Sequence, residues 1–320
     1  MKLEDPVYGV ENINEDVLKD LINSESTQRL KQIHQYGMPD EYYHKKNFSR
    51  YEHSVGVFIL LKRLNASLEE QIAGLLHDTS HLAFSHVADW VFGDPIKEDL
   101  QDNYHSEFIK NSDIPTILGK YNFDYKEISN HKNFSLLERE IPSLCADRID
   151  YSLRELKKEG FDTSDFVLNL MNKNGQIVFK NQRIAYKFAK EFLRLQNEHW
   201  NGIEARMRYF ILSKILRKAV DNNIIYQEDF YKTDSEIIEK LKKSSDSYII
   251  DNLDLLRNGF FIEEAGEGVN LPGKKFRYID PEILFNGVIK RLSEVSCSFS
   301  SLLKEKLNPS KERRFICKEK

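Results

Sequence analysis

The chain has 320 residues, of which 40% are hydrophobic and 31% charged, and this composition excludes a globally disordered protein. Its 47 basic and 51 acidic residues give a net charge of −4, which does not favour general binding to duplex nucleic acid. The longest apolar run, residues 55–61, is too short to cross a bilayer, and three scattered cysteines cannot form a disulfide framework. With no secretory signal at the N-terminus either, we expect a cytoplasmic protein that does not bind membranes.

Apolar residues recur every three or four positions through most of the chain, which is the period of amphipathic helices. Glycine and proline are sparse, with 14 and 8 residues. The pattern predicts helices, in chain order, at residues 27–33, 50–64, 67–78, 82–92, 142–158, 183–200 and 203–220. Residues 175–179 predict a short hairpin strand. Ala73 and Gly74 are small enough to let a second helix approach the third one closely.

The sequence pattern changes after about residue 225, where polar helices such as 234–243 alternate with β-like runs such as 275–279. We therefore predict a mostly α-helical core at residues 1–222 and a small mixed α+β region at 223–320. The chain ends in a basic tail made of Lys304, Lys306, Lys311, Arg313, Arg314, Lys318 and Lys320. We interpret this tail as solvated surface, with nucleic-acid contact as the alternative.

Three of the nine histidines fall within residues 76–89, together with two aspartates. They are His77, His81, His86, Asp78 and Asp89. Imidazole and carboxylate together are the ligand set of Zn, Mn, Fe and Co, although each residue alone is more often a satisfied polar side chain. Here the cluster directly follows Ala73 and Gly74, where two helices are expected to pack closely. Unpaired imidazole and carboxylate groups at such a buried place would cost several kcal/mol of desolvation. A bound cation would remove that cost.

A metal ion needs ligands from several helices to fix its geometry. His53, on the apolar side of the preceding helix, joins His77 and Asp78, and Asp147 is the best candidate for a fourth ligand. Four protein ligands leave one or two positions for water, whose pKa the ion would lower.

Further polar residues fit phosphate chemistry. His86 and Asp89 are spaced i, i+3, so the carboxylate can orient the imidazole and hold it protonated as a general acid. Arg50 and Arg148 adjoin the candidate ligands and could neutralise phosphate oxygens, although each alone is more often an ordinary ion-pair residue.

These residues resemble the H…HD…D set of the HD-domain metal-dependent phosphohydrolases. AGLLHDTSHLAFSH at 73–86 is similar to the AxLLHDxGHxPFSH stretch of the deoxynucleoside triphosphate triphosphohydrolase branch, and RYEHSVGV at 50–57 to its RFEHSLGV. DPVYG at 5–9, QYG at 35–37 and DRIDY at 147–151 resemble its DPVHG, QLG and DRxDY. The resemblance covers about residues 5–220, with Tyr36 in place of Leu and Ser80 in place of Gly as departures.

The resemblance implies an HD-domain helical bundle and a role for each matching residue. The metal ligands would be His53, His77, Asp78 and Asp147. The residues acting on the phosphate and the leaving group would be His86, Asp89, His105 and His81. The substrate-binding residues would be Arg50, Arg148, Tyr151, Gln35 and Tyr36. Lys187, Arg194 and Arg206 on the later helices are further candidates for phosphate binding.

The resemblance further implies a divalent cofactor (Mn, Fe, Co, Zn, Ni or Mg), one ion or two, and a homo-oligomer. The expected reaction converts a dNTP to a deoxynucleoside and triphosphate through attack of metal-bound water on the α-phosphate. One alternative is a nucleotidase or phosphodiesterase on another phosphoester. The other is a nucleotide-binding regulatory module without turnover.

Overall fold

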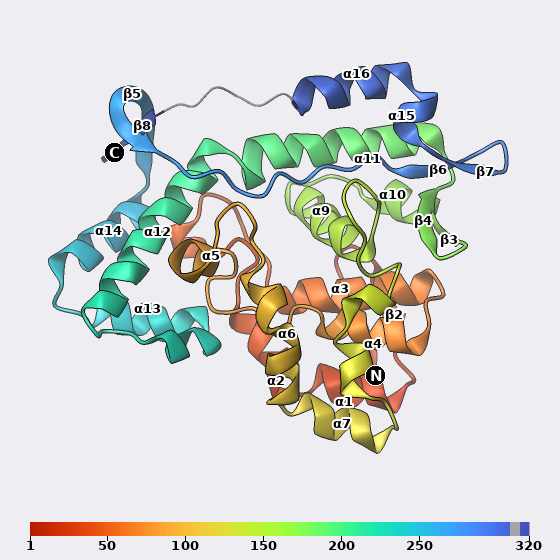
Figure 1. Ribbon diagram of the computed structural model, residues 1–320, viewed down its shortest axis with the longest axis horizontal. Helices are drawn as coiled ribbons and strands as arrows, with labels where there is room; N and C mark the ends of the chain where they lie inside the picture. Colours follow the sequence, from red (N-terminus) through yellow and green to blue (C-terminus); the bar gives the residue numbers. More distant parts are fainter. Residues whose placement is uncertain (308–313, 320) are drawn as a thin grey trace.

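The computed structural model describes residues 1–307 and 314–319, and most of them are helical (Figure 1). The α-helices as far as Leu195 are α1 (Asp16–Ile22), α2 (Glu25–Arg29), α3 (Arg50–Arg63), α4 (Leu68–Leu76), α5 (Val87–Phe92), α6 (Leu100–Lys110), α7 (Ile114–Lys120), α8 (Tyr125–Ile128), α9 (Ala146–Lys158), α10 (Ser164–Asn169) and α11 (Gln182–Leu195). The later ones are α12 (Ile203–Asp221), α13 (Asp234–Lys242), α14 (Ser247–Asn258), α15 (Leu292–Val295) and α16 (Cys297–Lys306). Short 3-10 turns are η1 (Leu30–Gln32), η2 (Asp40–Tyr42), η3 (His131–Asn133) and η5 (Gln227–Tyr231), and η4 (Gln196–Trp200) is a π-helical turn.

The strands form small sheets at the edges of the helical body. They are β1 (Lys2–Asp5), β2 (Gly9–Asn12), β3 (Leu170–Lys173), β4 (Gln176–Phe179), β5 (Phe260–Asn270), β6 (Glu282–Phe285), β7 (Val288–Arg291) and β8 (Arg314–Glu319). β1 pairs with β2, β5 with β8, and the remaining four run in the order β3-β4-β6-β7. All pairs are antiparallel except β4–β6, which is parallel and matches Phe179 with Ile283. The predicted fold class, mostly α with a mixed C-terminal part, is confirmed.

Local sequence explains the two helices that carry the histidines. Ser49 and Glu52 form a reciprocal capping box that starts α3, and the Ser67 hydroxyl accepts a hydrogen bond from the Glu70 amide at the start of α4. The two helices then pack closely because Gly74 has no side chain. A Cβ at this position would lie 2.3 Å from Leu61 Cδ1. The close approach that the sequence predicts for this step is therefore present.

The buried apolar residues form two clusters, and each contains residues from both ends of the chain. The first joins α3, α4, α9 and α11 with Ile279, Ile283 and Phe299. The second joins η1, α5, α12 and α14 with Phe260 and Leu271. The boundary predicted at residues 222–223 stays a prediction, and the hydrophobic packing crosses it.

Two predicted helices begin later than expected. The predicted helix at 82–92 is limited to Val87–Phe92, because Phe84 and Ser85 have φ angles of 65° and 47°, in the left-handed region. That turn is held by distant parts of the chain: the Ala83 amide donates to the Phe230 carbonyl and the Phe84 amide to Asp234. Similarly, α9 begins at Ala146 rather than Pro142.

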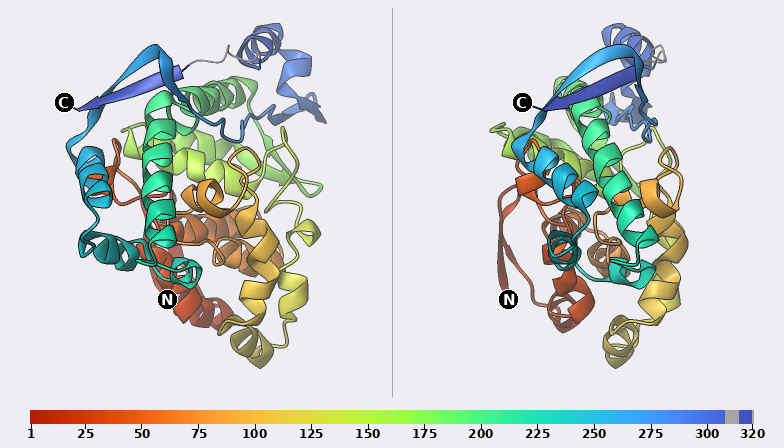
Figure 2. Two further views of the ribbon diagram at one scale, coloured as in Figure 1. Left: turned by 60° about the vertical axis from the view of Figure 1, so that its left-hand side comes forward. Right: turned by 90° about the vertical axis from the view of Figure 1, so that its left-hand side faces the viewer.

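The β5–β8 pair and α16 lie at one end of the molecule and α7 lies at the other (Figures 1 and 2). Of the predicted basic tail, Lys318 pairs with Glu263 at 2.6 Å, while Lys311, Arg313 and Lys320 are outside the described residues. Among the helices of the described part of the chain, none combines the length and apolar character needed to cross a membrane.

Candidate active site

Three predicted metal ligands meet where α3, α4 and α9 converge. His53 lies on α3, His77 caps the end of α4, and Asp147 lies in the first turn of α9. The two Nε2 atoms are 3.2 Å apart, and Asp147 Oδ1 is 3.0 Å from His53 Nε2 and 3.7 Å from His77 Nε2. Both imidazoles are buried. These three side chains form one potential metal-binding group.

The hydrogen bonds of the two imidazoles show why this group fits a cation. His53 Nδ1 lies 2.8 Å from Asp150 Oδ2, and His77 Nδ1 lies 2.7 Å from the Gly74 carbonyl. Because both partners are acceptors, each Nδ1 carries a hydrogen, and in the neutral form that binds a metal the two rings direct Nε2 lone pairs at each other. Two nitrogen lone pairs and a carboxylate oxygen repel one another unless a cation lies between them. Two nitrogens and one oxygen are suitable ligands for a divalent transition metal.

The fourth predicted ligand, Asp78, lies at the edge of this group. Its Oδ1 is 3.5 Å from His77 Nε2, and its Oδ2 is 3.8 Å from His53 Nε2. Arg50 Nη1 pairs with Oδ2 at 2.9 Å. Burial alone would raise the pKa of Asp78, but Arg50 and His77 hold it well below its ordinary value. Asp78 therefore stays ionised, next to both the candidate metal ligands and a guanidinium.

The group as a whole carries excess negative charge. Burial disfavours protonation of His77, but Asp78 and the hydrogen bond to Asp147 raise its pKa to about 9. Without a metal ion the cluster thus attracts a proton in its place. The group of His53, His77, Asp78 and Asp147 therefore needs a positive charge, either a metal ion or a proton.

His81 and His86 continue the row of histidines beyond Asp78. His81 Nε2 lies 3.3 Å from Asp78 Oδ1, and burial together with Arg50 lowers the pKa of His81 to about 3, so this ring is neutral. The His86 ring is 5.2 Å from that of His81, and its Nδ1 lies 3.2 Å from Asp89 Oδ2. The predicted pairing of His86 with Asp89 is therefore present.

His105 reaches the same region from α6. Its Nδ1 lies 2.8 Å from the Ser80 hydroxyl, so Ser80, where the resembling family has glycine, holds this ring in place. The His105 ring also packs 4.4 Å from that of His131, a histidine that the sequence did not single out. Burial and His131 hold the pKa of His105 well below its ordinary value.

Arg148 is placed differently from the expectation for a phosphate-binding residue. Its Nη2 pairs with Glu138 Oε1 at 2.8 Å, and its Nη1 lies 2.9 Å from Cys145 Sγ. Glu138, Cys145 and Asp147 could by composition hold a second ion. The guanidinium already supplies the positive charge there, which argues against a second ion beside Glu138.

The predicted substrate-binding side chains lie on the α9 and η1 sides of the cluster. Tyr151 is 6.2 Å from His53, ring to ring, and its hydroxyl and Gln35 Oε1 are buried without a hydrogen-bond partner among the described residues. Tyr36 packs edge-on against His199, 4.6 Å between ring centroids. Arg194 pairs with Glu159 and Glu191, and Lys187 lies over the Phe166 ring, so these two later-helix candidates are engaged elsewhere.

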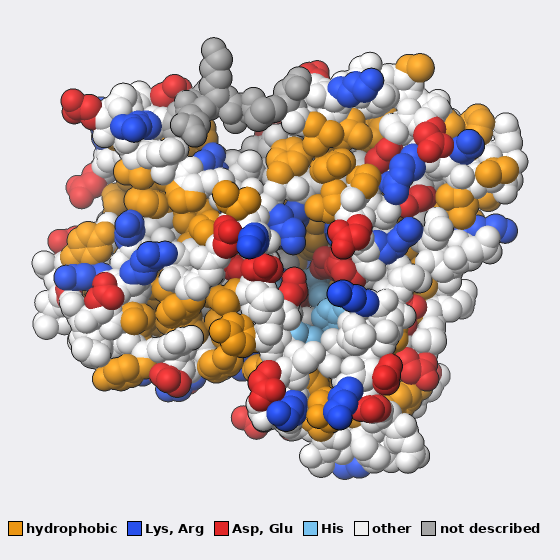
Figure 3. Space-filling model, viewed as in Figure 1, with side chains coloured by type: hydrophobic (Ala, Val, Ile, Leu, Met, Phe, Trp, Pro, Cys, Tyr) orange, Lys and Arg blue, Asp and Glu red, His pale blue; other side chains and the backbone are white. Residues whose placement is uncertain are grey.

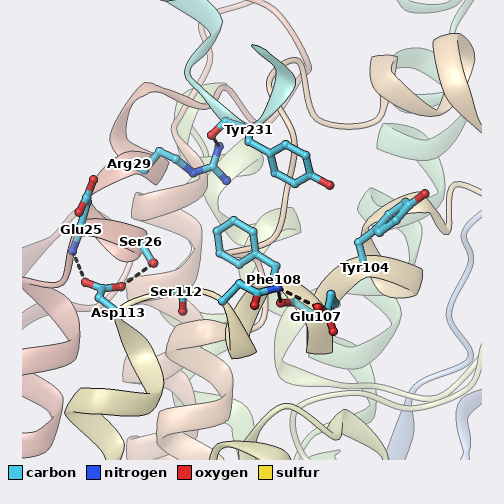
Figure 4. A pocket seen from close by; sticks show the side chains of 10 residues that line it. Glu25, Ser26, Arg29, Tyr104, Glu107, Phe108, Ser112, Asp113 and Tyr231 are labelled. Carbon is cyan, nitrogen blue, oxygen red and sulfur yellow. Dashed lines mark hydrogen bonds between the residues drawn. The ribbon is translucent and has the colours of Figure 1, made fainter. Parts of the chain in front are cut away.

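Figure 3 shows histidine side chains at the bottom of a hollow in one face of the molecule, with acidic and basic side chains around it. A separate pocket of about 490 Å³ lies between α2, α6 and η5 (Figure 4). Arg29 lines that pocket and donates hydrogen bonds from Nη2 to the Thr79 and His81 carbonyls. Arg29 therefore supports, from the pocket side, the loop that carries His81.

Nothing in the sequence indicated one ion cluster near the site, which is centred on the buried Glu98. The side chain of Glu98, from the loop between α5 and α6, is fully buried, and it pairs with Arg277 Nη2 at 2.6 Å. Lys274 Nζ lies 3.8 Å away. Burial would raise the pKa of Glu98, but Arg277, His86 and Lys274 lower it to about 2.

This shift predicts a pH dependence of stability. Because the folded-state pKa of Glu98 lies below its ordinary 4.5, the stabilisation is complete above about pH 4.5 and is lost as the pH falls towards 2. The Glu98→Gln variant should therefore lose less unfolding free energy than the wild type between pH 5 and pH 3 in urea denaturation. Glu228→Gln, at an exposed site, is the control. The prediction would be contradicted if the unfolding free energies of wild type and Glu98→Gln fell by the same amount between pH 5 and pH 3.

Comparisons with known proteins agree with this geometry. The HD domain family model matches residues 50–155, the segment that supplies all four predicted ligands. The uncharacterised protein YdhJ of Bacillus subtilis is 35% identical over 302 residues, 92% of each chain. The metal-dependent phosphohydrolase cns2 of Cordyceps militaris is 27% identical over 293 residues, 88% of this chain and 84% of cns2.

Two further matches are more distant or shorter. A solved phosphohydrolase structure from Bacteroides thetaiotaomicron has a TM-score of 0.65 at 19% identity, covers 100% of both chains and shows the shared fold. The deoxynucleoside triphosphate triphosphohydrolase SAMHD1 of Bos taurus is 33% identical over 105 residues, 28% of this chain and 18% of SAMHD1. The chain therefore belongs to the HD domain family of metal-dependent phosphohydrolases.

Proposed function

We propose that this protein hydrolyses deoxynucleoside triphosphates to a deoxynucleoside and triphosphate. The observation that carries the proposal is the row of side chains leading away from the His53–His77–Asp147 group: Asp78 with Arg50, then His81, then His86 with Asp89. Such a row provides a cation site, a guanidinium and a proton donor in sequence, which suits a charged phosphate chain. The motifs at residues 50–57, 73–86 and 147–151 and the partial match to SAMHD1 support the deoxynucleotide assignment.

His53, His77 and Asp147 would hold the divalent ion, with Asp78 beside them. When bound, such an ion polarises a phosphoryl oxygen and lowers the pKa of a nearby water. Arg50 is fixed by Asp78 and by the Ser85 hydroxyl, 3.0 Å from its Nε, and so presents positive charge beside the ion site for the developing phosphoryl charge.

His86 is suited to protonate the leaving 5′-oxygen. Its Nδ1 is bound to Asp89, so Nε2 is the atom that passes the proton to the leaving group. Asp89 also accepts a hydrogen bond from the Leu100 amide at 3.0 Å, which fixes its carboxylate between α5 and α6. On the sugar side, Tyr151 would pack against the deoxyribose, where a ring face disfavours a 2′-hydroxyl.

A substrate screen with product analysis tests the proposal. The protein, loaded in turn with Mn, Fe, Co, Zn, Ni or Mg, is incubated with dNTPs, rNTPs, dNMPs and cyclic nucleotides. We expect deoxynucleoside and triphosphate in equal amounts, with ¹⁸O from labelled water in the triphosphate, because attack at the α-phosphorus breaks the bond to the 5′-oxygen. Stepwise release of phosphate, or preference for a cyclic nucleotide, would instead identify a nucleotidase or a phosphodiesterase. Absence of any product would reject the proposal.

A further inference from the structure

A segment from the C-terminal region runs across the helical body next to the candidate active site. Residues 271–281 connect β5 to β6 and cross α12 in the view of Figure 1. Arg206 on α12 donates a hydrogen bond to the Pro272 carbonyl, and the Arg277 amide donates to Gln196 Oε1 at 3.1 Å. These contacts fix the segment so that Lys274 and Arg277 point inward and are largely buried.

Between these two cations lies the carboxylate of Glu98. Its backbone has a φ of 48°, a left-handed conformation that residues other than glycine rarely adopt. The Glu98 amide donates to the Asp94 carbonyl at 3.0 Å, which stabilises the turn that directs the side chain inward. A fully buried carboxylate is thus held by its own loop between two basic side chains from the far end of the chain.

This ion cluster adjoins the row of catalytic candidates. The loop that carries Glu98 connects α5, which begins after His86, to α6, which carries His105. Burial raises the pKa of Tyr151, Arg277 lowers it and Asp147 raises it, so this phenol lies within electrostatic reach of both charges. Lys274 Nζ lies 3.6 Å above the Tyr209 ring. The cluster therefore adjoins the active-site region at His86, whose charge also lowers the pKa of Glu98, and at Tyr209.

We propose that Lys274 and Arg277 bind the terminal phosphates of the substrate, and that Glu98 is an internal anion that occupies this site until phosphate displaces it. This inference rests on the proposed function, since it specifies how a triphosphate is distinguished from a single phosphoester. A guanidinium can bind phosphate through two parallel hydrogen bonds, and the several negative charges of a polyphosphate outcompete a single carboxylate for the two cations.

Binding of inorganic triphosphate tests the site directly. Calorimetry on the metal-loaded full chain at fixed salt should show that Glu98→Gln binds triphosphate about tenfold more tightly than wild type, because the competing carboxylate charge is gone. Arg277→Gln and Lys274→Met should each bind it about tenfold more weakly. Arg194→Gln removes a basic residue that is paired with Glu159 and Glu191, and it should leave the affinity unchanged.

The same variants distinguish two roles of Glu98: an internal anion that competes with phosphate, and a residue that only stabilises its loop. If Glu98 only braces the loop, Glu98→Gln lowers the melting temperature without strengthening triphosphate binding, and the proposal is overturned. If that variant does not fold, Arg277→Gln decides, since unchanged triphosphate affinity in this variant equally overturns the proposal. In turnover, Glu98→Gln should lower KM for a dNTP and leave KM for a substrate with one phosphate unchanged.

The outcome is distinguishable from failure of the proposed function, because triphosphate binding needs no hydrolysis. Tighter triphosphate binding by Glu98→Gln in a protein that hydrolyses no dNTP supports this site and rejects the dNTPase assignment. Efficient dNTP hydrolysis with equal triphosphate affinity in all variants supports the dNTPase assignment and rejects this phosphate site.

Discussion

Replacing Asp147 with asparagine should remove the bound metal ion and reduce phosphohydrolase activity by about a thousandfold, because the ion contributes several kcal/mol to the transition state. Asp147 is the only carboxylate within 3.0 Å of His53 Nε2 among the described residues, and it approaches His77 Nε2 as well. An amide at this position supplies no negative charge, so the two imidazoles would have to hold a divalent cation with only Asp78 beside them, and its charge is already paired with Arg50. Metal content by mass spectrometry and turnover in the same preparation give the measurement.

Glu138→Gln provides the matched control. Glu138 lies close enough to Asp147 to belong to a second potential metal-binding group, but its carboxylate is paired with Arg148. We expect this variant to keep one ion per chain and most of its activity. If instead Asp147→Asn retains the ion at wild-type affinity, the ion is bound by other residues, and the His53–His77–Asp147 group is not the metal site.

The candidate metal ligands could be selected from the sequence because each signal was local. The helical period placed His53 on the inner face of its helix, and α3 (Arg50–Arg63) matches the predicted range 50–64. The small residues before His77 indicated close packing, which the contact between Gly74 and Leu61 confirms. The adjacent HD pair and the DRIDY motif then supplied the remaining candidates.

The features that the sequence did not reveal all depend on distant partners. The turn at Phe84 and Ser85 interrupts a helical pattern because Phe230 and Asp234 supply its hydrogen bonds. The guanidinium of Arg148 is turned to Glu138, which lies in a loop that no periodic pattern predicts. Glu98 and Arg277 are likewise far apart along the chain, and neither belongs to a motif. Local periodicity contains no information about such pairs.

Asp150 was within reach of sequence reasoning but was overlooked. It follows Asp147 by three positions, so both carboxylates lie on one face of α9, and each approaches one ring nitrogen of His53. This spacing could have identified it as the residue that orients the imidazole. Its position also explains Gly56, since a Cβ there would lie 2.1 Å from Asp150 Oδ1 and 1.8 Å from Arg154 Nη2.

Asp150→Asn should therefore weaken both metal binding and the fold. Asp150 Oδ2 accepts from His53 Nδ1 at 2.8 Å and from Arg154 Nε at 2.7 Å, and all three side chains are buried. Loss of the carboxylate charge leaves the His53 ring less firmly oriented, which typically costs about 10- to 100-fold in metal affinity, as for other outer-shell partners. It also removes one of the two carboxylates around Arg154, which should cost about 3–5 kcal/mol of unfolding free energy.

Asp5→Asn separates these two effects. Asp5 Oδ2 accepts from Arg154 Nη2 at 2.6 Å, so this variant breaks the other half of the same buried ion pair without contact to His53. We expect it to lose stability in urea denaturation while its metal affinity, measured by titration calorimetry, stays within about threefold of wild type. Equal losses of metal affinity in Asp5→Asn and Asp150→Asn would mean that the effect passes through general destabilisation, and Asp150 would then have no specific role in orienting His53.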